Sequence, residues 1–238
     1  MSKSECQRFL INPLKYVRDV CINLQTPSGK RSLSDFDANN CHEHCWFDLV
    51  PWSTSLFSFG GASQVILEPT TKRGDDLITG YYVPYISYGV VKNHIDEPVL
   101  LKGVPEKMPP RSFVFTGGQN GCSLLMMKGT EPNTVDFMHY PNSDGKESGY
   151  PLLERVKPTA KTAEDIILSI DFDDYGEKYN PNACSFFYHD GKEWVAVTQP
   201  QVQGAVDMER KRCSMSINKN KRPRYLKKNS EALSWVEI

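Results

Sequence analysis

The stretch that most constrains the fold is 112–140, where three hydrophobic runs alternate with two turns. The runs 112–115, 124–127 and 135–140 carry aromatic, β-branched and long apolar side chains, which favour strands. The turn between the first two runs holds three glycines, and glycine permits backbone conformations that other residues resist. This alternation favours a sheet with tight turns over a bundle of helices.

The rest of the chain fits the same class. Its 238 residues include 16 glycines, 16 prolines, 11 tyrosines and 11 phenylalanines, a composition typical of sheet-rich and turn-rich proteins. Further runs with strand character are 65–67, 77–86, 99–101, 185–189 and 194–198. We therefore predict an α+β fold, with β-sandwich-like mixed sheets and a few covering helices, in a single domain that spans 1–238.

Local signals place turns and helices between these runs. Asp190-Gly191 predicts a hairpin between its flanking strands, and 72–75 predicts another between 65–67 and 77–86. Three segments predict helices: 6–24, with Pro13 near its start or at a kink; a helix that starts at 162–165 and leads into 166–168; and a short helix from a Ser230 cap through Val236.

Charge is unevenly distributed along the chain. Residues 208–238 carry nine Lys or Arg and three acids, a net +6, which leaves −7 for 1–207 because the whole chain is at −1. The densest part, 219–228, could meet nucleic acid, an acidic membrane or an acidic protein surface. Charge runs are more often solvated surface, so we expect this basic segment at the periphery of the domain and do not expect a nucleic-acid partner.

The cysteines and the N-terminus indicate where the protein works. Seven cysteines are an odd number, and their positions lack the framework spacing of a small secreted scaffold. No apolar stretch approaches the length of a membrane span, and the first residues lack the pattern of a cleavable secretory signal. We expect reduced thiols and a cytosolic working environment, which also suits a protein exported without a cleaved signal.

The glycine turn leads into a cysteine in a position suited to catalysis. In the run Thr116-Gly117-Gly118-Gln119-Asn120-Gly121-Cys122, the flexible backbone can point several amide hydrogens into one concavity. Such amides favour a thiolate and can bind a tetrahedral oxyanion, so the backbone at Asn120 and Gly121 is a candidate oxyanion turn. Cys122 is therefore a candidate nucleophile.

His139 supplies a candidate base on the next strand. If the second turn is centred near Thr130 and Glu131, Cys122 faces His139 or Tyr140, and directly opposed side chains have Cβ atoms roughly 5 Å apart. A one-residue slip in register decides which face His139 occupies, and the sequence leaves it open. A Cys–His pair can attack a carboxamide, release ammonia and hydrolyse the resulting thioester. A third group is expected to orient the imidazole.

These residues resemble the catalytic core of the cytotoxic necrotizing factor and Burkholderia lethal factor glutamine deamidases. There a Gly-Cys pair precedes a hydrophobic strand, and a histidine follows across a hairpin; the lethal factor also has a threonine six positions before its cysteine, as Thr116 is here. In this chain Gln119-Asn120 stands where the family motif has Leu-Ser, and the spacing from Cys122 to His139 is somewhat longer. In the necrotizing-factor branch a backbone carbonyl orients the histidine, so both kinds of orienting group stay open.

The resemblance implies a bacterial toxin or effector that converts one glutamine of a host protein to glutamate. Cys122 would be the nucleophile, His139 the base and Thr116 the orienting group. It also implies a compact sandwich-like domain, a protein substrate such as a Rho-type GTPase or a translation-initiation RNA helicase, and action in the host cytoplasm after secretion or injection. We expect a monomer that needs no cofactor.

Other constellations are weaker. In Cys41-His42-Glu43-His44-Cys45 neither a helix nor a strand makes four ligands converge, so we expect no metal there. Cys184 and His189 would face opposite sides of one strand. Residues 171–176 begin like a calcium loop but lack its later ligands, and we expect an acidic surface turn. The competing functions are a thiol protease or transglutaminase and a non-catalytic binding module that uses 219–228.

Overall fold

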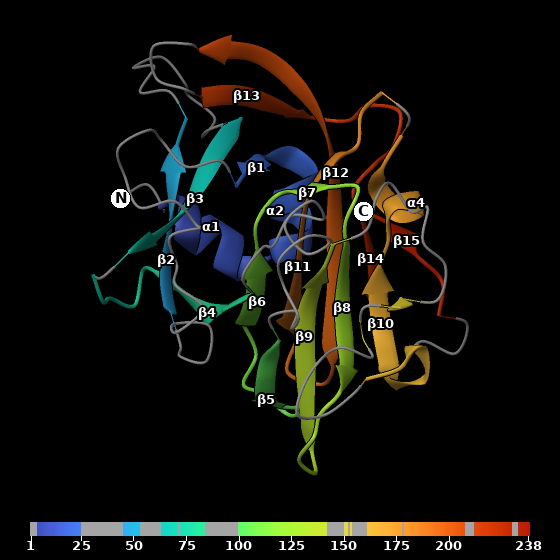
Figure 1. Cartoon of the computed structure of the whole chain (residues 1–238). Helices are drawn as coiled ribbons and strands as arrows, with labels where there is room; N and C mark the ends of the chain where they lie inside the picture. Colours follow the sequence, from blue (N-terminus) through green and yellow to red (C-terminus); the bar gives the residue numbers. More distant parts are fainter. Residues whose placement is uncertain are drawn as a thin grey trace.

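The structure is a computed structural model that describes residues 4–24, 45–52, 63–70, 72–83, 100–141, 150–151, 153, 161–177, 179–207, 212–229 and 233–238. Within these residues the chain is mostly β-sheet with few helices, which agrees with the β-rich class predicted from the sequence (Figure 1). The seven-residue helices of the N-terminal region are the longest helices described, and none in the described part is long and apolar enough to cross a bilayer.

Two short helices begin the described chain in place of the single helix predicted at 6–24. Helix α1 (Glu5–Ile11) ends at Asn12, whose side chain accepts a hydrogen bond from Lys15 N and so caps α2 (Pro13–Asp19). Pro13 occupies the first turn of α2, where its missing N–H costs nothing. The prediction was wrong beyond Asp19, because Cys21–Asn23 forms strand β1.

A large mixed sheet forms the centre of the molecule. Strands β1 and β3 (Gln64–Thr70) are parallel, as are β4 (Ile78–Val83) and β6 (Ser112–Thr116), and the other neighbours are antiparallel. The strand order is β1, β3, β2 (Cys45–Pro51), β4, β6, β11 (Asn182–His189), β12 (Trp194–Asp207), β14 (Arg224–Lys227) and β15 (Val236–Glu237), while β13 (Arg212–Ile217) pairs with β12 and β7 (Gln119–Asn120) pairs with β11.

A second, four-stranded antiparallel sheet packs on one face of the large sheet. Its order is β10 (Ile166–Ile170), β8 (Ser123–Lys128), β9 (Thr134–Tyr140) and β5 (Leu101–Pro105). Val114 of the large sheet and Leu124 and Phe137 of the small sheet belong to one buried apolar cluster, so the two sheets share a core. On the opposite face, α1 and α2 bury Phe9 and Val17 against the large sheet.

One predicted hairpin is confirmed and the other is wrong. Strands β11 and β12 pair in antiparallel register from Asn182↔Gln201 to His189↔Trp194, around the turn at Asp190-Gly191. By contrast, β3 and β4 are not paired with each other, because each pairs with β2, which lies between them. The segment 72–75 therefore lies between β3 and β4 in the chain, and β2 separates these two strands in the sheet.

One predicted helix gives way to a strand after a single turn, and the described part of another is not helical. After a single 3-10 turn at Ala163–Asp165, the apolar run that follows pairs with β8 as β10, because its isoleucines complete the core between the sheets. At the C-terminus, Val236–Glu237 forms β15 against β14. Ser230, the predicted cap, lies outside the described residues, as does 84–86 of the run predicted at 77–86.

Candidate active site

Thr116 and His139 meet in the layer between the two sheets. Thr116 ends β6 two residues after Val114, so its side chain points to the same face of the strand, towards the small sheet. His139 lies two residues after Phe137 on β9, so its side chain points towards the large sheet. The Thr116 hydroxyl oxygen lies 2.6 Å from His139 Nδ1, and both side chains are almost completely buried. The structure therefore brings together two of the three residues predicted for the catalytic group.

The hydrogen-bond pattern defines the tautomer of His139. Thr116 Oγ1 donates its one hydrogen to the carbonyl of Val83, at 2.9 Å. That hydroxyl must therefore accept from His139, so Nδ1 carries the imidazole hydrogen and Nε2 is the basic nitrogen of the neutral ring. Burial lowers the pKa of His139 to about 3, which keeps the ring neutral at physiological pH. A neutral imidazole with a basic Nε2 is the form that a general base requires.

Cys122 lies just outside the ladder that holds His139. Strands β8 and β9 pair Ser123 with Tyr140 and Leu124 with His139, so the prediction that Cys122 directly faces His139 or Tyr140 was wrong. The true turn is centred one residue later than expected. Cys122 directly precedes Ser123, the first residue of β8, and Leu124, two positions further on, is the residue that lies opposite His139.

One glycine of the turn adopts a backbone conformation that other residues resist. Gly121 has a φ of +86°, a left-handed conformation that disfavours side chains, and it bends the chain directly before Cys122. Asn120 is exposed and pairs with Asn182 through β7, so the large sheet holds the outer part of the turn. The oxyanion role of the backbone at Asn120 and Gly121 stays a prediction.

Two residues that sequence reasoning missed hold the backbone of Cys122. Its carbonyl accepts one hydrogen bond from Tyr175 Oη, at 2.7 Å, and one from Gln119 Nε2, at 3.2 Å. Tyr175 is completely buried at the end of α4 (Phe172–Tyr175), where an acidic surface turn was predicted. No local signal marks Tyr175, because its partner is 53 residues away in the sequence.

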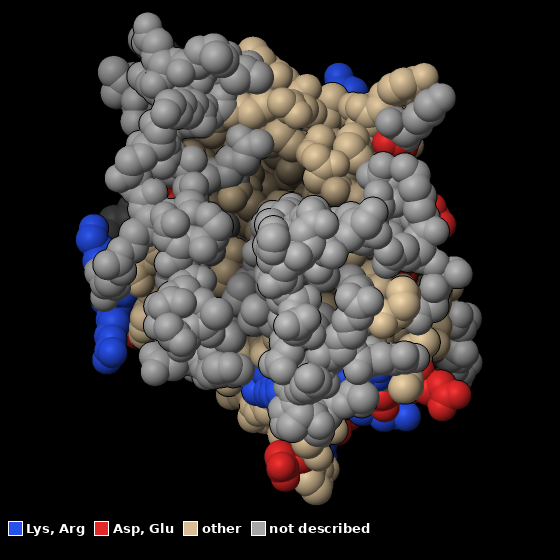
Figure 2. All heavy atoms as spheres, in the orientation of Figure 1, with Lys and Arg blue, Asp and Glu red and all other residues tan. Residues whose placement is uncertain are grey.

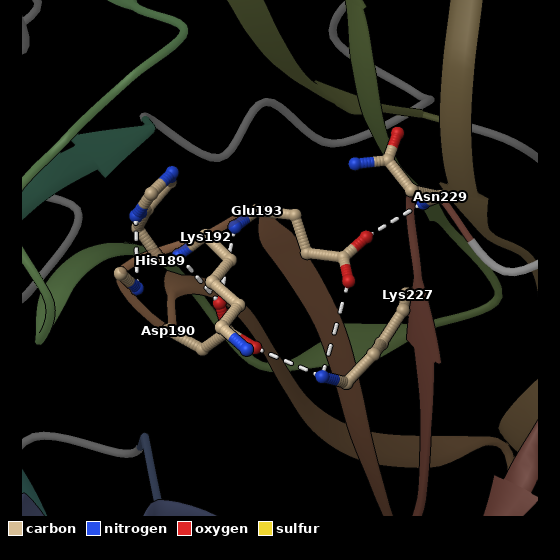
Figure 3. A network of polar contacts seen from close by, with 7 residues as sticks. His189, Asp190, Lys192, Glu193, Lys227 and Asn229 are labelled. Carbon is tan, nitrogen blue, oxygen red and sulfur yellow. Dashed lines mark hydrogen bonds and ion pairs between the residues drawn. The ribbon is translucent and has the colours of Figure 1, made fainter.

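The basic segment 219–228 is engaged within the molecule rather than left open. Lys221 Nζ donates to the carbonyls of Asp173 and Gly176, at 2.6 and 3.1 Å, and Arg224 donates to that of Asp174. Lys227 pairs with Asp190 and Glu193 (Figure 3), and Lys228 pairs with Glu106. Four of its six cations thus have partners on neighbouring elements, which reduces the charge that an external partner would meet.

The competing constellations do not assemble into sites within the described residues. Cys41–His44 lies outside them, and Cys45 is a buried residue of β2. No group of three or more His, Cys, Asp or Glu in the described part could hold a metal ion. Cys184 packs in the core under the helices while His189 lies against Trp194 on the opposite face of the sheet, so the expectation that they point apart is confirmed.

Figure 2 shows a hollow in one face of the molecule. Near the places of β1 and β7 in Figure 1, that face is hollowed and its described lining carries no charge, whereas charged side chains gather below the small sheet. Cys122 itself is only 4% exposed. A reagent or substrate therefore reaches its sulfur only after atoms that cover it move aside.

Comparison with known proteins found no match. No protein-family model matches this chain, and no curated protein sequence is similar to it.

Proposed function

We propose that this chain is a protein glutamine deamidase in which Cys122 is the nucleophile, His139 the general base and Thr116 the group that orients the base. The observation that carries the proposal is the Val83–Thr116–His139 hydrogen-bond chain, which gives His139 a basic Nε2. A buried histidine with this tautomer, on the strand paired with the one that Cys122 precedes, supports a nucleophile–base–orienter mechanism.

The reaction follows from the roles of these groups. His139 Nε2 takes the Cys122 thiol proton as the sulfur attacks the carboxamide carbon of a glutamine, and the backbone amides of the 120–122 turn bind the oxyanion. The imidazolium then protonates the leaving nitrogen, ammonia departs, and a thioester remains. His139 next takes a proton from water, which attacks the thioester and releases glutamate and the thiol.

The wider biological assignment is part of the same proposal. The chain would be a bacterial toxin or effector that is secreted or injected and acts as a monomer in the host cytoplasm. Its sheets would form the sandwich-like α+β domain that the deamidase family implies. A Rho-type GTPase and a translation-initiation RNA helicase are the substrate classes that this resemblance favours.

Mass spectrometry tests the chemistry and identifies the target together. Host-cell lysate is treated with wild type, Cys122→Ser, or Cys213→Ser, which changes a cysteine of similar burial on strand β13. We expect a gain of about 1 Da at one glutamine with wild type and Cys213→Ser, and no gain with Cys122→Ser, because only the first two retain the nucleophile.

Other outcomes distinguish the competing functions. Chain cleavage would indicate a thiol protease, and addition of an amine would indicate a transglutaminase, since the same thioester can react with either acceptor. Full activity of a folded Cys122→Ser protein would contradict every thiol mechanism. An unmodified lysate, together with salt-sensitive binding to nucleic acid or anionic lipid, would favour a binding module instead.

A further inference from the structure

We propose that Tyr175 is a positioning residue for Cys122, and that Lys221 and Arg224 of the basic segment 219–228 form an internal brace that holds Tyr175 in place. The catalytic meaning of this inference rests on the proposed function. Its structural content does not, because the brace acts on the backbone of Cys122 whatever the thiol does.

Cys122 lies between strands β7 and β8. It follows Gly121, whose left-handed φ turns the chain, and it precedes the first ladder pair of β8 at Ser123. Its carbonyl accepts hydrogen bonds from Tyr175 and from Gln119 of β7, and these bonds limit rotation of the backbone that aims the thiol.

Tyr175 is in turn held through the short helix α4. A four-residue helix has little stability of its own, since helix formation is cooperative and its first turn is costly. Phe172 packs edge-to-face on the Tyr175 ring, with centroids 5.8 Å apart. The carbonyls at the end of α4 accept hydrogen bonds from Lys221 and Arg224, the favourable place for cations at a helix C-terminus.

The two halves of the basic segment therefore have different tasks. Lys221 and Arg224 donate hydrogen bonds to backbone carbonyls of α4. Lys227 and Lys228 instead form ion pairs with acidic residues on other elements. Contacts within the protein thus account for the positive charges of Lys221 and Arg224 in the middle of the segment 219–228. It also links the C-terminal part of the chain to the candidate nucleophile through one continuous path from Arg224 to α4, Tyr175 and the Cys122 carbonyl.

The first test removes one hydroxyl group. Tyr175→Phe is compared with Tyr16→Phe, a matched control in which the lost hydroxyl binds Glu5 on the helical layer. Native protein is treated with iodoacetamide, and alkylation of each cysteine is followed by peptide mass spectrometry. We expect Cys122 in Tyr175→Phe to react about five to ten times faster than in wild type, because loss of a net hydrogen bond favours local opening. Cys184 reports global opening and should keep its wild-type rate.

The second test removes the brace. Lys221→Met and Arg224→Met, singly and together, are compared with Lys227→Met from the same segment. The double variant should resemble Tyr175→Phe, with faster alkylation of Cys122 alone, and Lys227→Met should behave as wild type. Deamidation by Tyr175→Phe should show a kcat about tenfold lower with KM nearly unchanged, since substrate binding does not use this contact.

The outcomes separate this inference from the proposed function. If wild type does not deamidate any protein, yet Cys122 alkylation rises selectively in Tyr175→Phe, the positioning role stands and the activity is wrong. Equal rises at Cys122 and Cys184 would show that Tyr175 only stabilises the fold. An unchanged Cys122 rate in both Tyr175→Phe and the double variant would overturn the inference.

Discussion

The two buried histidines of the described structure, His139 and His189, differ in one hydrogen bond that decides their chemistry. Each is 2% exposed and lies at or near the end of a strand. His139 donates from Nδ1 to Thr116, whereas His189 accepts at Nδ1 from the backbone N–H of Gly191 (Figure 3). The neutral His189 ring therefore carries its hydrogen on Nε2 and packs against Trp194.

This contrast shows that burial alone does not make a base. Burial lowers the pKa of both rings, so both are expected to be neutral at physiological pH. Only His139 has a partner at Nδ1 that leaves Nε2 able to accept a proton. His189 instead closes the turn between β11 and β12, beside the Asp190–Lys227 ion pair. Its role is structural.

Replacement of each histidine by glutamine should give the largest difference. His139→Gln removes the base, and general acid–base catalysis is worth about 10²–10⁴ in rate, so kcat for deamidation should fall by that order. His189→Gln should keep kcat within about twofold, because it acts only on the turn. Single-turnover assays on the target protein measure both. A large loss of kcat in a folded His189→Gln protein would reverse the assignment.

Removal of the Thr116 hydroxyl should give a smaller loss that depends on the tautomer. Thr116→Val leaves Nδ1 of His139 without its acceptor, so we expect kcat to fall about 10- to 100-fold and stability to fall by about 1–3 kcal/mol. Thr198→Val is the matched control, since Thr198 is equally buried and bonds Ser185. It should lose comparable stability without losing kcat. Denaturant unfolding and kinetics together separate the two effects.

The pH dependence of stability should identify His139 as a group that is neutral when folded. Its pKa is lowered from 6.5 to about 3, so below pH 6.5 the unfolded chain takes up a proton that the folded protein does not. Stability is therefore highest above pH 6.5 and falls towards pH 3, with a loss of about 2 kcal/mol at pH 5 from this group. His139→Gln should remove that part of the pH dependence, as measured by urea unfolding at pH 7.5 and 5.

Sequence reasoning was most successful where local chemistry determines the structure. The hairpin at Asp190-Gly191 follows from a turn that only a few residues favour, and the sequence alone indicates Thr116 and His139 as candidate site residues. The pairing of β8 with β9 was expected, but its register was not, because a shift of one residue changes no local preference. Register is fixed by the core between the sheets, to which distant segments contribute.

The features that the sequence did not predict also depend on contacts between segments that are far apart in the chain. The apolar run of β10 was read as a helix because isoleucines at 166–170 satisfy either pattern, and only the edge of the small sheet selects the strand. Tyr175 and the carbonyl contacts of Lys221 and Arg224 join segments about 50 residues apart. Side-chain periodicity carries no information about such contacts, so the support of Cys122 was not visible in the sequence.

The smallest expected effect concerns the turn beside His189. Hydrogen bonds from Lys227 and from the backbone of 192 and 193 lower the pKa of Asp190 from 3.8 to about 2, against the opposing effect of its burial. Its contribution is present above pH 3.8 and is lost as the pH falls towards 2. Because Lys227 is more than a third exposed, screening limits the ion pair, and Asp190→Asn should cost less than about 1 kcal/mol at pH 7.

The matched measurement is the same substitution followed at both histidines. In Asp190→Asn, an NMR titration should show the His189 pKa falling further, because the neighbouring carboxylate raises it, while the His139 signal stays unchanged. A shift at His139 would mean that the two regions are coupled through the shared core between the sheets. If neither histidine responds, the turn acts through its backbone hydrogen bonds alone, and the electrostatic part of the comparison is wrong. Selective response of His189 would confirm that two equally buried histidines are governed by separate local partners.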